Sequence, residues 1–397
     1  MWHRCMQRLN LIFKWVNSLF AGRPRWVAVV SRAFMATALG LTLSVWLVDA
    51  LVLSTTSMFS SPEKRDFQLP DLFAQIADNR PVRKYDDRII IVDIGHSDRL
   101  GIAEGLSLLS LCGPKAVGVD INFADPGEYD TVLTDALTSC PNLVLPLGVG
   151  PTKEQGEYKI TDKPFFYNDL KDIHYGIVNF PMNANKGTIR EYAITFPTDQ
   201  GIIPSYAKAL AEIADPEAVE VLDSREEPTG VTEYHSREYK TVHIEDIEEH
   251  AEDFADKIVL VGALEDAGDM HATTIKSHVP GMLLHAAALS TMLDKTWYVK
   301  IPKTADYLIA VSLCFILMVV AYSFKNNLKG ITIRILQGLL AFLAVRVGYE
   351  LFVDHYVILD LSFTIMIIAF GFLAADIWNG IETLWHIGAE KLETKYN

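Results

Sequence analysis

The sequence predicts an α/β domain with a mainly parallel sheet flanked by helices, joined to an all-α membrane region of four transmembrane helices. Two observations predict this division. Half of the 397 residues are hydrophobic and the mean hydropathy is +0.18, but the long apolar runs gather near the two ends. Residues 54–303 instead hold 23 Lys or Arg against 41 Asp or Glu, and short β-branched runs alternate there with helical patterns. Such alternation is typical of parallel strands joined by crossover helices.

The first predicted span covers residues 26–53, which is long enough to cross about 30 Å of hydrocarbon. Basic residues and no acidic one lie before it or at its start: Arg4, Arg8, Lys14, Arg23, Arg25 and Arg32. The positive-inside rule therefore places the N-terminus in the cytoplasm. A cleaved signal peptide is the alternative, but the basic region is too long and no clear cleavage site follows.

Three further apolar runs follow the polar segment, at residues 305–324, 331–353 and 356–378. The basic turn 325–329 between the first two belongs in the cytoplasm by the same rule, so Asp354-His355 faces outside. Both termini are then cytoplasmic, and residues 54–303 lie outside a bacterial inner membrane. The predicted segments are a basic amphipathic helix at 1–25, a span at 26–53, the extracytoplasmic domain at 54–303, three spans within 304–378 and a cytoplasmic tail at 379–397.

Residues 1–25 and 379–397 have apolar side chains at helical spacing. In the first segment, basic residues between Trp2, Met6, Leu9 and Phe13 favour a helix lying in the lipid headgroups. Docking on the protein's own spans is the alternative. The tail is too short for a catalytic domain.

The extracytoplasmic segment alternates strands and helices from its start. The first half contains predicted strands at 88–93, 116–120 and 142–147, with helices at 103–111 and 129–138 between them. This order implies right-handed crossovers and a parallel sheet. The second half contains predicted strands at 176–180, 192–196, 238–243 and 257–262, and a helix at 281–293.

Polar side chains follow three of these strands at their carboxyl ends, where ligands of open α/β sheets bind. If the three strands are neighbours, the side chains converge on one edge and suit a divalent cation or a cationic or polyhydroxylated ligand. The candidate ligand-binding residues are Asp93, His96, Asp98, Asp120, Asn122, Asp269 and His271. The alternative is structural, because Asp and Asn after a strand often cap the next helix or form turns.

No catalytic motif is present: HExxH, Cys-x-x-Cys, Gly-x-Ser-x-Gly and the phosphate loop are all missing. His271, His278 and His285 are spaced by seven, which is more typical of solvated or helix-packing histidines than of metal ligands. We therefore expect no enzyme and no cofactor, and leave the presence of a metal open.

Two extracytoplasmic cysteines, Cys112 and Cys140, each close a predicted helix just before a strand. Because successive crossover helices on one sheet face end at the same edge, these cysteines are candidates for a disulfide in an oxidising compartment. The bond requires Cα atoms within about 7 Å, and free thiols are the equal alternative.

Charged residues inside membrane spans are costly and are functional candidates. Four such residues lie at similar depth toward the outer side: Asp49, Arg346, Glu350 and Asp360. They predict a polar cluster that either couples the outer domain to helix packing or holds the bundle as a static ion-pair network.

The order of these motifs resembles the second type of CHASE domain, a family of sensory extracellular domains associated with cyclases and histidine kinases. Four segments carry the resemblance: Ile89–Asp93 with 96–98, Gly118–Phe123, 175–179 with Gly187–Arg190, and Lys257–Gly262 with Gly268-Asp269 and Pro280–Ala286. The match covers about 60–303, and one span before the domain with three after it is typical of the family. The sequence departs from the pattern at Lys186-Gly187 and at Thr273–Ile275.

The resemblance implies a sensor of a ligand, an envelope partner or stress. Family members usually feed a cytoplasmic output domain, whereas this chain stops soon after its last predicted span, so we expect a subunit that signals to a separate effector. The expected partners are membrane lipid, a membrane or cytoplasmic effector protein and a second copy in a homo-oligomer, while the acidic charge excludes nucleic acid. The alternatives are a structural or assembly protein of an envelope complex and, less favoured, a metal-dependent enzyme using Asp93, Asp120 and Asp269.

Overall fold

The computed structural model describes residues 24–59, 69–78, 84–152, 157–167, 169–170, 173–180, 187–223, 229–231, 237–323 and 329–396. The predicted amphipathic helix at 1–25 lies almost wholly outside them. The chain forms two compact units. We call Asp71–Val299 the α/β unit, and the N-terminal helix with Lys300–Asn397 the helical unit.

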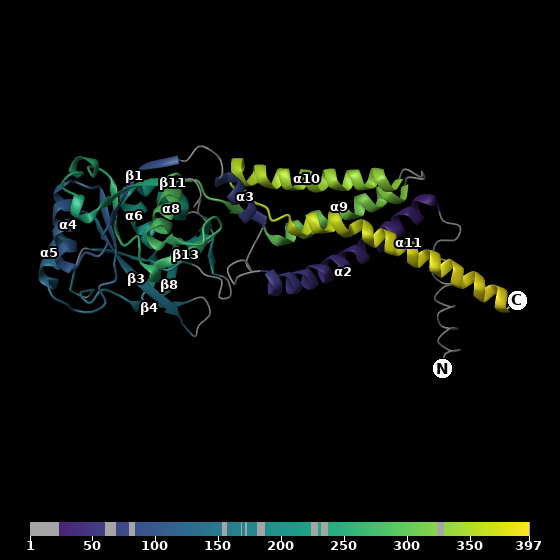
Figure 1. Ribbon diagram of the computed structural model, residues 1–397, viewed down its shortest axis with the longest axis horizontal. Coiled ribbons are helices and arrows are strands. Elements are labelled where there is room, and N and C mark those ends of the chain that lie inside the picture. Colours follow the sequence, from purple (N-terminus) through teal and green to yellow (C-terminus); the bar gives the residue numbers. More distant parts are fainter. Residues whose placement is uncertain are drawn as a thin grey trace. The chain divides into compact units, whose positions relative to one another are not determined.

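A mainly parallel sheet forms the centre of the α/β unit, as Figure 1 shows. Its strand order is β11–β1–β12–β2–β3–β4–β8–β9, with β5 pairing β3. The strands are β1 (Lys84–Asp93), β2 (Ala116–Asp120), β3 (Leu143–Pro151), β4 (Tyr158–Asp162), β5 (His174–Ile177), β8 (Thr195–Thr198), β9 (Gly201–Pro204), β11 (Arg237–His243) and β12 (Ile258–Gly262). Strands β11, β1, β12, β2, β3 and β5 run parallel, so the predicted mixed α/β architecture is confirmed.

Strand β12 lies between β1 and β2, although it follows them late in the chain. All five of its residues are buried, as expected for a β-branched strand covered on both faces. Its last residue, Gly262, pairs with Asp93 on one side and with Asp120 on the other. The carboxyl ends of β1, β12 and β2, which the predicted polar residues follow, therefore lie side by side at the same edge of the sheet.

Helices cover both faces of this sheet. One face carries α4 (Arg99–Leu111) and α5 (Asp130–Ser139), and the other carries α6 (Tyr206–Ala214), α7 (Pro216–Asp223) and α8 (Gly281–Leu293). Alternate residues of β1 pack against the two helix layers, because successive strand side chains point to opposite faces of the sheet. Ile90 and Val92 pack on the side of α4, and Ile89 and Ile91 pack on the side of α8. The short, alanine-rich α6 was not predicted.

Small strands beside the main sheet complete the unit. Strands β14 (Val279–Pro280), β13 (Met270–Thr273) and β6 (Thr188–Ile189) form a three-stranded sheet, which we call the β6–β13 wall. Strand β10 (Thr229–Val231) pairs with β7 (Glu191–Ala193). Helix α3 (Leu69–Asp78) precedes the main sheet in the chain.

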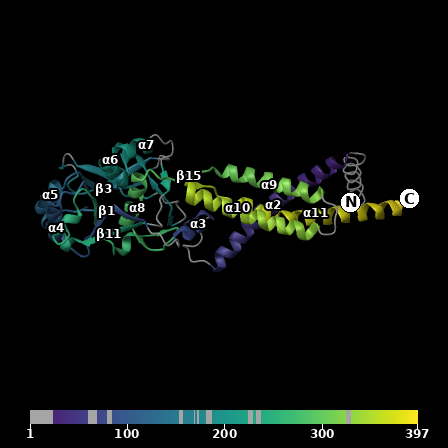
Figure 2. The same cartoon turned by 90° about the horizontal axis from the view of Figure 1, so that it is seen from above.

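The helical unit consists of α2 (Arg25–Phe59), α9 (Lys303–Ser323), α10 (Lys329–His355) and α11 (Ser362–Tyr396), visible in Figure 2. Small residues line the contacts between them, including Ala33, Ala310 and Ala375, and small side chains let membrane helices approach closely. Three helical stretches are long and apolar enough to cross a membrane: Arg25–Leu43, Lys303–Ser323 and Arg334–His355. A fourth candidate is the bent pair Ser362–Ile368 and Leu373–Leu384, which meets at 41°.

Three members of the predicted polar cluster in the spans have described side chains, and they make local contacts. Arg346 pairs with Glu350 of its own helix at 2.7 Å, and both side chains are about half exposed. Asp360 instead accepts hydrogen bonds from the backbone N–H and hydroxyl of Ser362, at the start of α11. The side chain of Asp49 lies outside the described residues.

A different carboxylate, Asp306, makes a buried polar contact within the bundle. It accepts hydrogen bonds from the backbone N–H groups of Phe363 and Thr364, each at 3.2 Å, and from the Thr364 hydroxyl. These bonds join α9 to α11. Sequence reasoning missed Asp306 because it lies at the end of an apolar run, where a solvated carboxylate is the ordinary expectation.

Candidate functional site

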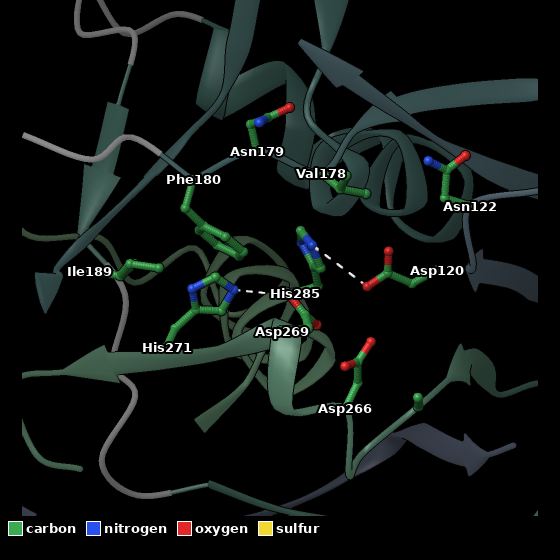
Figure 3. A pocket seen from close by; sticks show the side chains of 11 residues that line it. Asp120, Asn122, Val178, Asn179, Phe180, Ile189, Asp266, Asp269, His271 and His285 are labelled. Carbon is green, nitrogen blue, oxygen red and sulfur yellow. Dashed lines mark hydrogen bonds and ion pairs between the residues drawn. The ribbon is translucent and has the colours of Figure 1, made fainter. Parts of the chain in front are cut away.

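A cavity of about 370 Å³ opens beside the carboxyl ends of β2 and β12 in the α/β unit, as Figure 3 shows. This volume lies at the lower end of the range for small-molecule pockets, about 300–1,000 Å³. Four of the predicted site residues line it: Asp120, Asn122, Asp269 and His271. The other lining residues combine polar groups (Asn179, Asp266, His285) with apolar ones (Val178, Phe180, Ile189, Ala263).

The three predicted residues of the first strand end do not line the cavity. Asp93 accepts hydrogen bonds from the backbone N–H groups of Gly95 and Leu264, each at 3.1 Å, and so ties its own turn to the loop after β12. Asp98 caps α4 by accepting from the backbone N–H of Gly101 at 2.9 Å. His96 is exposed in the turn between them. Asp93 and Asp98 therefore have the structural roles, in a turn and a helix cap, that the sequence offered as the alternative to ligand binding.

Asp120 is the central carboxylate of the cavity. It ends β2 beside Gly262, and its side chain is only 16% exposed. Burial and the nearby Asp269 carboxylate raise the pKa of Asp120 to about 7, although His271 opposes this shift. Around neutral pH, therefore, this side chain can both hold a proton and carry a charge.

His285 faces Asp120 from the first turns of α8. Its ring lies against Phe180, with centroids 4.6 Å apart, and edge-on to Tyr206 at 5.1 Å. The distance from His285 Nε2 to Asp120 Oδ2 is 3.8 Å, too long for a hydrogen bond. Burial lowers the pKa of His285 to about 4, so the ring is neutral at pH 7. The helix-packing interpretation of His285 is therefore incomplete, because the ring also lines the cavity.

The opposite side of the cavity is built on Asp269. Its Oδ2 accepts from the backbone N–H of Gly281 at 3.1 Å, where a carboxylate suits the positive end of α8, and its Oδ1 lies 3.0 Å from His271 Nε2. A Cβ at Gly281 would come within 2.3 Å of Asp269 Oδ2, so this close approach requires glycine.

The β6–β13 wall joins the cavity to α3. Ile189 lines the cavity, and the next residue, Arg190, forms a two-pronged ion pair with Asp71 of α3, both bonds measuring 2.8 Å. The two side chains are 14% and 5% exposed. A second link runs from Gln75 Nε2 of α3 to the backbone carbonyl of Thr274 at 2.9 Å. Arg190, which the sequence singled out without a role, thus anchors α3 to the cavity wall.

A metal site and a metal-dependent enzyme are the two alternatives that can be compared with this geometry. Within the described residues, no group of three or more His, Cys, Asp or Glu side chains is close enough to hold a metal ion, and Asp93 does not line the cavity with Asp120 and Asp269, the other two carboxylates of the metal-dependent enzyme alternative.

The predicted disulfide is wrong for this structure: Cys112 and Cys140 are free thiols, directed at the carbonyls of Leu108 and Leu106. Burial raises the pKa of Cys140 to about 12, so the thiol is inert.

Comparison with known proteins gives one match. A sequence model of the CHASE2 domain matches residues 43–322, which is more than half of the chain. No curated protein and no solved structure matches. CHASE2 domains are extracellular sensory domains of membrane proteins, in agreement with the resemblance and with the three helices long enough to span a membrane.

Proposed function

We propose that this chain, which belongs to the CHASE2 family, is a bacterial inner-membrane sensory subunit that detects a small ligand outside the membrane and signals to a separate effector. The observation that carries the proposal is the cavity beside β2 and β12, where a buried histidine and a buried carboxylate face each other. Ligands of open α/β sheets bind at this edge of the sheet.

Both chain connections to the membrane helices begin at elements that form or hold this cavity. Helix α3, the next described element after α2, holds the β6–β13 wall through Arg190–Asp71 and Gln75–Thr274. Helix α8 carries His285, and the chain passes from its end at Leu293 to α9. A ligand that contacts His271 and His285 therefore acts on both connections, and shifts them if it binds one arrangement more tightly than the other.

The proposed topology has four spans, with the bent pair in α11 as the fourth, both termini in the cytoplasm and residues 54–303 outside. Protease added to intact spheroplasts tests this arrangement. It should cleave within 54–303 and leave an epitope tag at either terminus intact. Loss of either tag without lysis would contradict it.

The effector is a separate membrane or cytoplasmic protein in this proposal, and the direct test is its isolation. The tagged chain is crosslinked in native membranes, purified in mild detergent, and its partners are identified by mass spectrometry. We expect a stoichiometric effector that is lost when residues 1–25 or 379–397 are deleted. The matched control is the exposed α4 substitution Glu104→Gln, which should retain it. Recovery of homo-oligomers or envelope proteins alone would refute signalling and favour a structural or assembly role.

A further inference from the structure

We infer that the cavity binds a small organic cation, whose charged nitrogen lies between Asp120 and His285 and whose carbon skeleton lies against Phe180. The inference rests on the proposed sensory function and names the chemical class of its ligand. Four features of the cavity support it: the charge of its lining, a buried histidine without a hydrogen bond, an aromatic face, and the protonation behaviour of Asp120.

The charge of the lining favours a cation. Asp120, Asp266 and Asp269 all line the cavity, and none of the described residues that line it is Lys or Arg. An anionic ligand would meet three carboxylates with no fixed positive charge to offset them. A cation removes the mutual repulsion of these carboxylates, which contributes to the raised pKa of Asp120.

His285 is an independent indication that something polar binds here. Its side chain is only 7% exposed, and no described residue forms a hydrogen bond with its ring nitrogens. Buried polar groups in proteins nearly always have a partner, so this ring is expected to bond to a ligand or a water in the cavity. In Figure 3 the ring and the Asp120 carboxylate face one another, joined by the dashed line.

The separation of these two groups suits an ammonium ion. Two acceptors 3.8 Å apart can both lie about 2.9 Å from a single nitrogen. The low pKa of His285 keeps its ring neutral, so one ring nitrogen can accept a hydrogen bond while Asp120 supplies the negative charge. A hydroxyl group of a polyol would fit the same gap, but it would leave the charge of the carboxylates uncompensated.

The aromatic side of the cavity fits the rest of such a ligand. Phe180 lies between the two histidines, with its ring centroid 4.6 Å from that of His285 and 6.4 Å from that of His271. An aromatic face attracts a cation within about 6 Å and covers its methylene groups.

Binding is expected to depend on pH because Asp120 must be charged. The titratable side chains that face Asp120 are Asp266 and Asp269 from the loop after β12, His271 from β13, His285 from α8 and Tyr206 from α6. Burial and the Asp120 charge raise the pKa of Tyr206 well above its usual value, so this hydroxyl stays neutral over the pH range of the test. Below pH 7 the proton on Asp120 competes with the cation, so affinity should fall as the pH is lowered. The affinity of an anion for the same cavity would change in the opposite direction.

The test uses the purified full-length chain in mild detergent, with four probes at millimolar concentration: 1,4-diaminobutane, sorbitol, succinate and calcium chloride. Binding is measured by calorimetry and by the thermal unfolding midpoint at pH 8 and pH 5.5. We expect 1,4-diaminobutane to bind and to raise the midpoint, with affinity at least about tenfold higher at pH 8 because the proton competes below the pKa of Asp120. Sorbitol, succinate and calcium should have no effect.

Two substitutions connect this binding to the named groups. Asp120→Asn should weaken the binding of 1,4-diaminobutane by about ten- to a hundredfold, because it removes the negative charge that pairs with the ammonium nitrogen. His285→Leu should weaken it by a similar factor, because it removes the acceptor ring nitrogen. Glu104→Gln, on the exposed face of α4, should bind like the unmodified chain. If a variant fails to fold, the pH dependence of the unmodified chain still decides the result.

The outcomes separate this inference from the proposed function. Binding of sorbitol, succinate or calcium without the amine would overturn the organic-cation assignment and leave a ligand sensor in place. Failure of all four probes would also overturn it, while the isolation of an effector would independently support signalling. Amine binding that is unchanged in both variants would place the ligand elsewhere and refute the inference.

Discussion

Replacing Asp120 with Asn should stabilise the α/β unit at neutral and alkaline pH and have little effect near pH 4. The Asp120 side chain is 16% exposed, and its pKa is raised from 3.8 to about 7 in the folded protein. Between these two values the folded state holds a proton that the unfolded state has lost. The free energy of unfolding of the native protein therefore falls as the pH rises through this window. Asn has the same shape but cannot ionise, so the variant does not undergo this loss.

The size of the effect follows from the rise of the Asp120 pKa from 3.8 to about 7. Because a tenfold change in an acid dissociation constant corresponds to about 1.4 kcal/mol, the variant should gain at most about 4 kcal/mol relative to the native protein by pH 8. His285 contributes a pH dependence of opposite sign. Its folded pKa is lowered from 6.5 to about 4, so its stability contribution grows as the pH rises between these values. Because both proteins contain His285, its contribution largely cancels in their difference.

The assay is urea-dependent proteolysis of the full-length chain in detergent, which reports the unfolding midpoint at several pH values between 4.5 and 8. The control is Asp125→Asn, an exposed carboxylate in the loop after the same strand, which should leave the pH profile unchanged. A difference between Asp120→Asn and the native protein that stays constant across this pH range would show that Asp120 does not hold a proton in the cavity, and the reasoning would fail.

Three further predictions concern contacts within each of the two units. Asp71→Asn should destabilise the α/β unit by about 3–5 kcal/mol, because Asp71 no longer supplies a negative charge to the largely buried Arg190 guanidinium. The substitution should also expose α3 to protease, and exposed Glu104→Gln is the control. Gly281→Ala should displace Asp269 from the start of α8, lowering the thermal midpoint and weakening the binding of 1,4-diaminobutane, whereas Gly187→Ala, whose added Cβ has nothing within 4 Å, should do neither. Asp306→Ala should lower the free energy of unfolding of the helical unit in detergent by at least about 2 kcal/mol, because it removes the hydrogen bonds to Thr364. Tyr307→Phe should leave this free energy unchanged. Equal unfolding midpoints for both variants would show that Asp306 does not hold the bundle together.

The main strands could be predicted from sequence because the local signal is strong. Compact β-branched runs correctly located β1, β2, β3 and β12, and α8 begins and ends at the predicted residues. The insertion of β12 between β1 and β2 could not be predicted, since strand order depends on contacts between segments far apart in the chain. Helix α6 was missed because its alanine-rich sequence is short and lies among turn-rich segments.

The candidate site was predicted only where its residues follow strand ends. Asp120, Asn122, Asp269 and His271 line the cavity as a group, but His285 and Phe180 were not assigned to it. His285 comes from a helix on one face of the sheet, and no pattern in the sequence indicates that its ring reaches the carboxyl edge. In the predicted span cluster, Arg346 and Glu350 pair with each other, while the convergence of all four residues stays a prediction, because depth along a helix does not fix which face a side chain occupies.

Asp93 and Asp120 are the last residues of β1 and β2, the two strands that flank β12, yet their surroundings give them different roles. Asp93 receives two backbone N–H groups and joins two loops, so its charge is satisfied within the fold. Asp120 is buried beside another carboxylate, and no described residue donates a hydrogen bond to it. The ionised form of Asp120 is therefore disfavoured at neutral pH, compared with that of a solvated carboxyl group. A bound cation would stabilise that form together with the β6–β13 wall and α8 around it, and a ligand that stabilises one arrangement increases its population. In the sensory function proposed above, pairing of a cation with Asp120 would supply the free-energy difference between the ligand-free and ligand-bound arrangements.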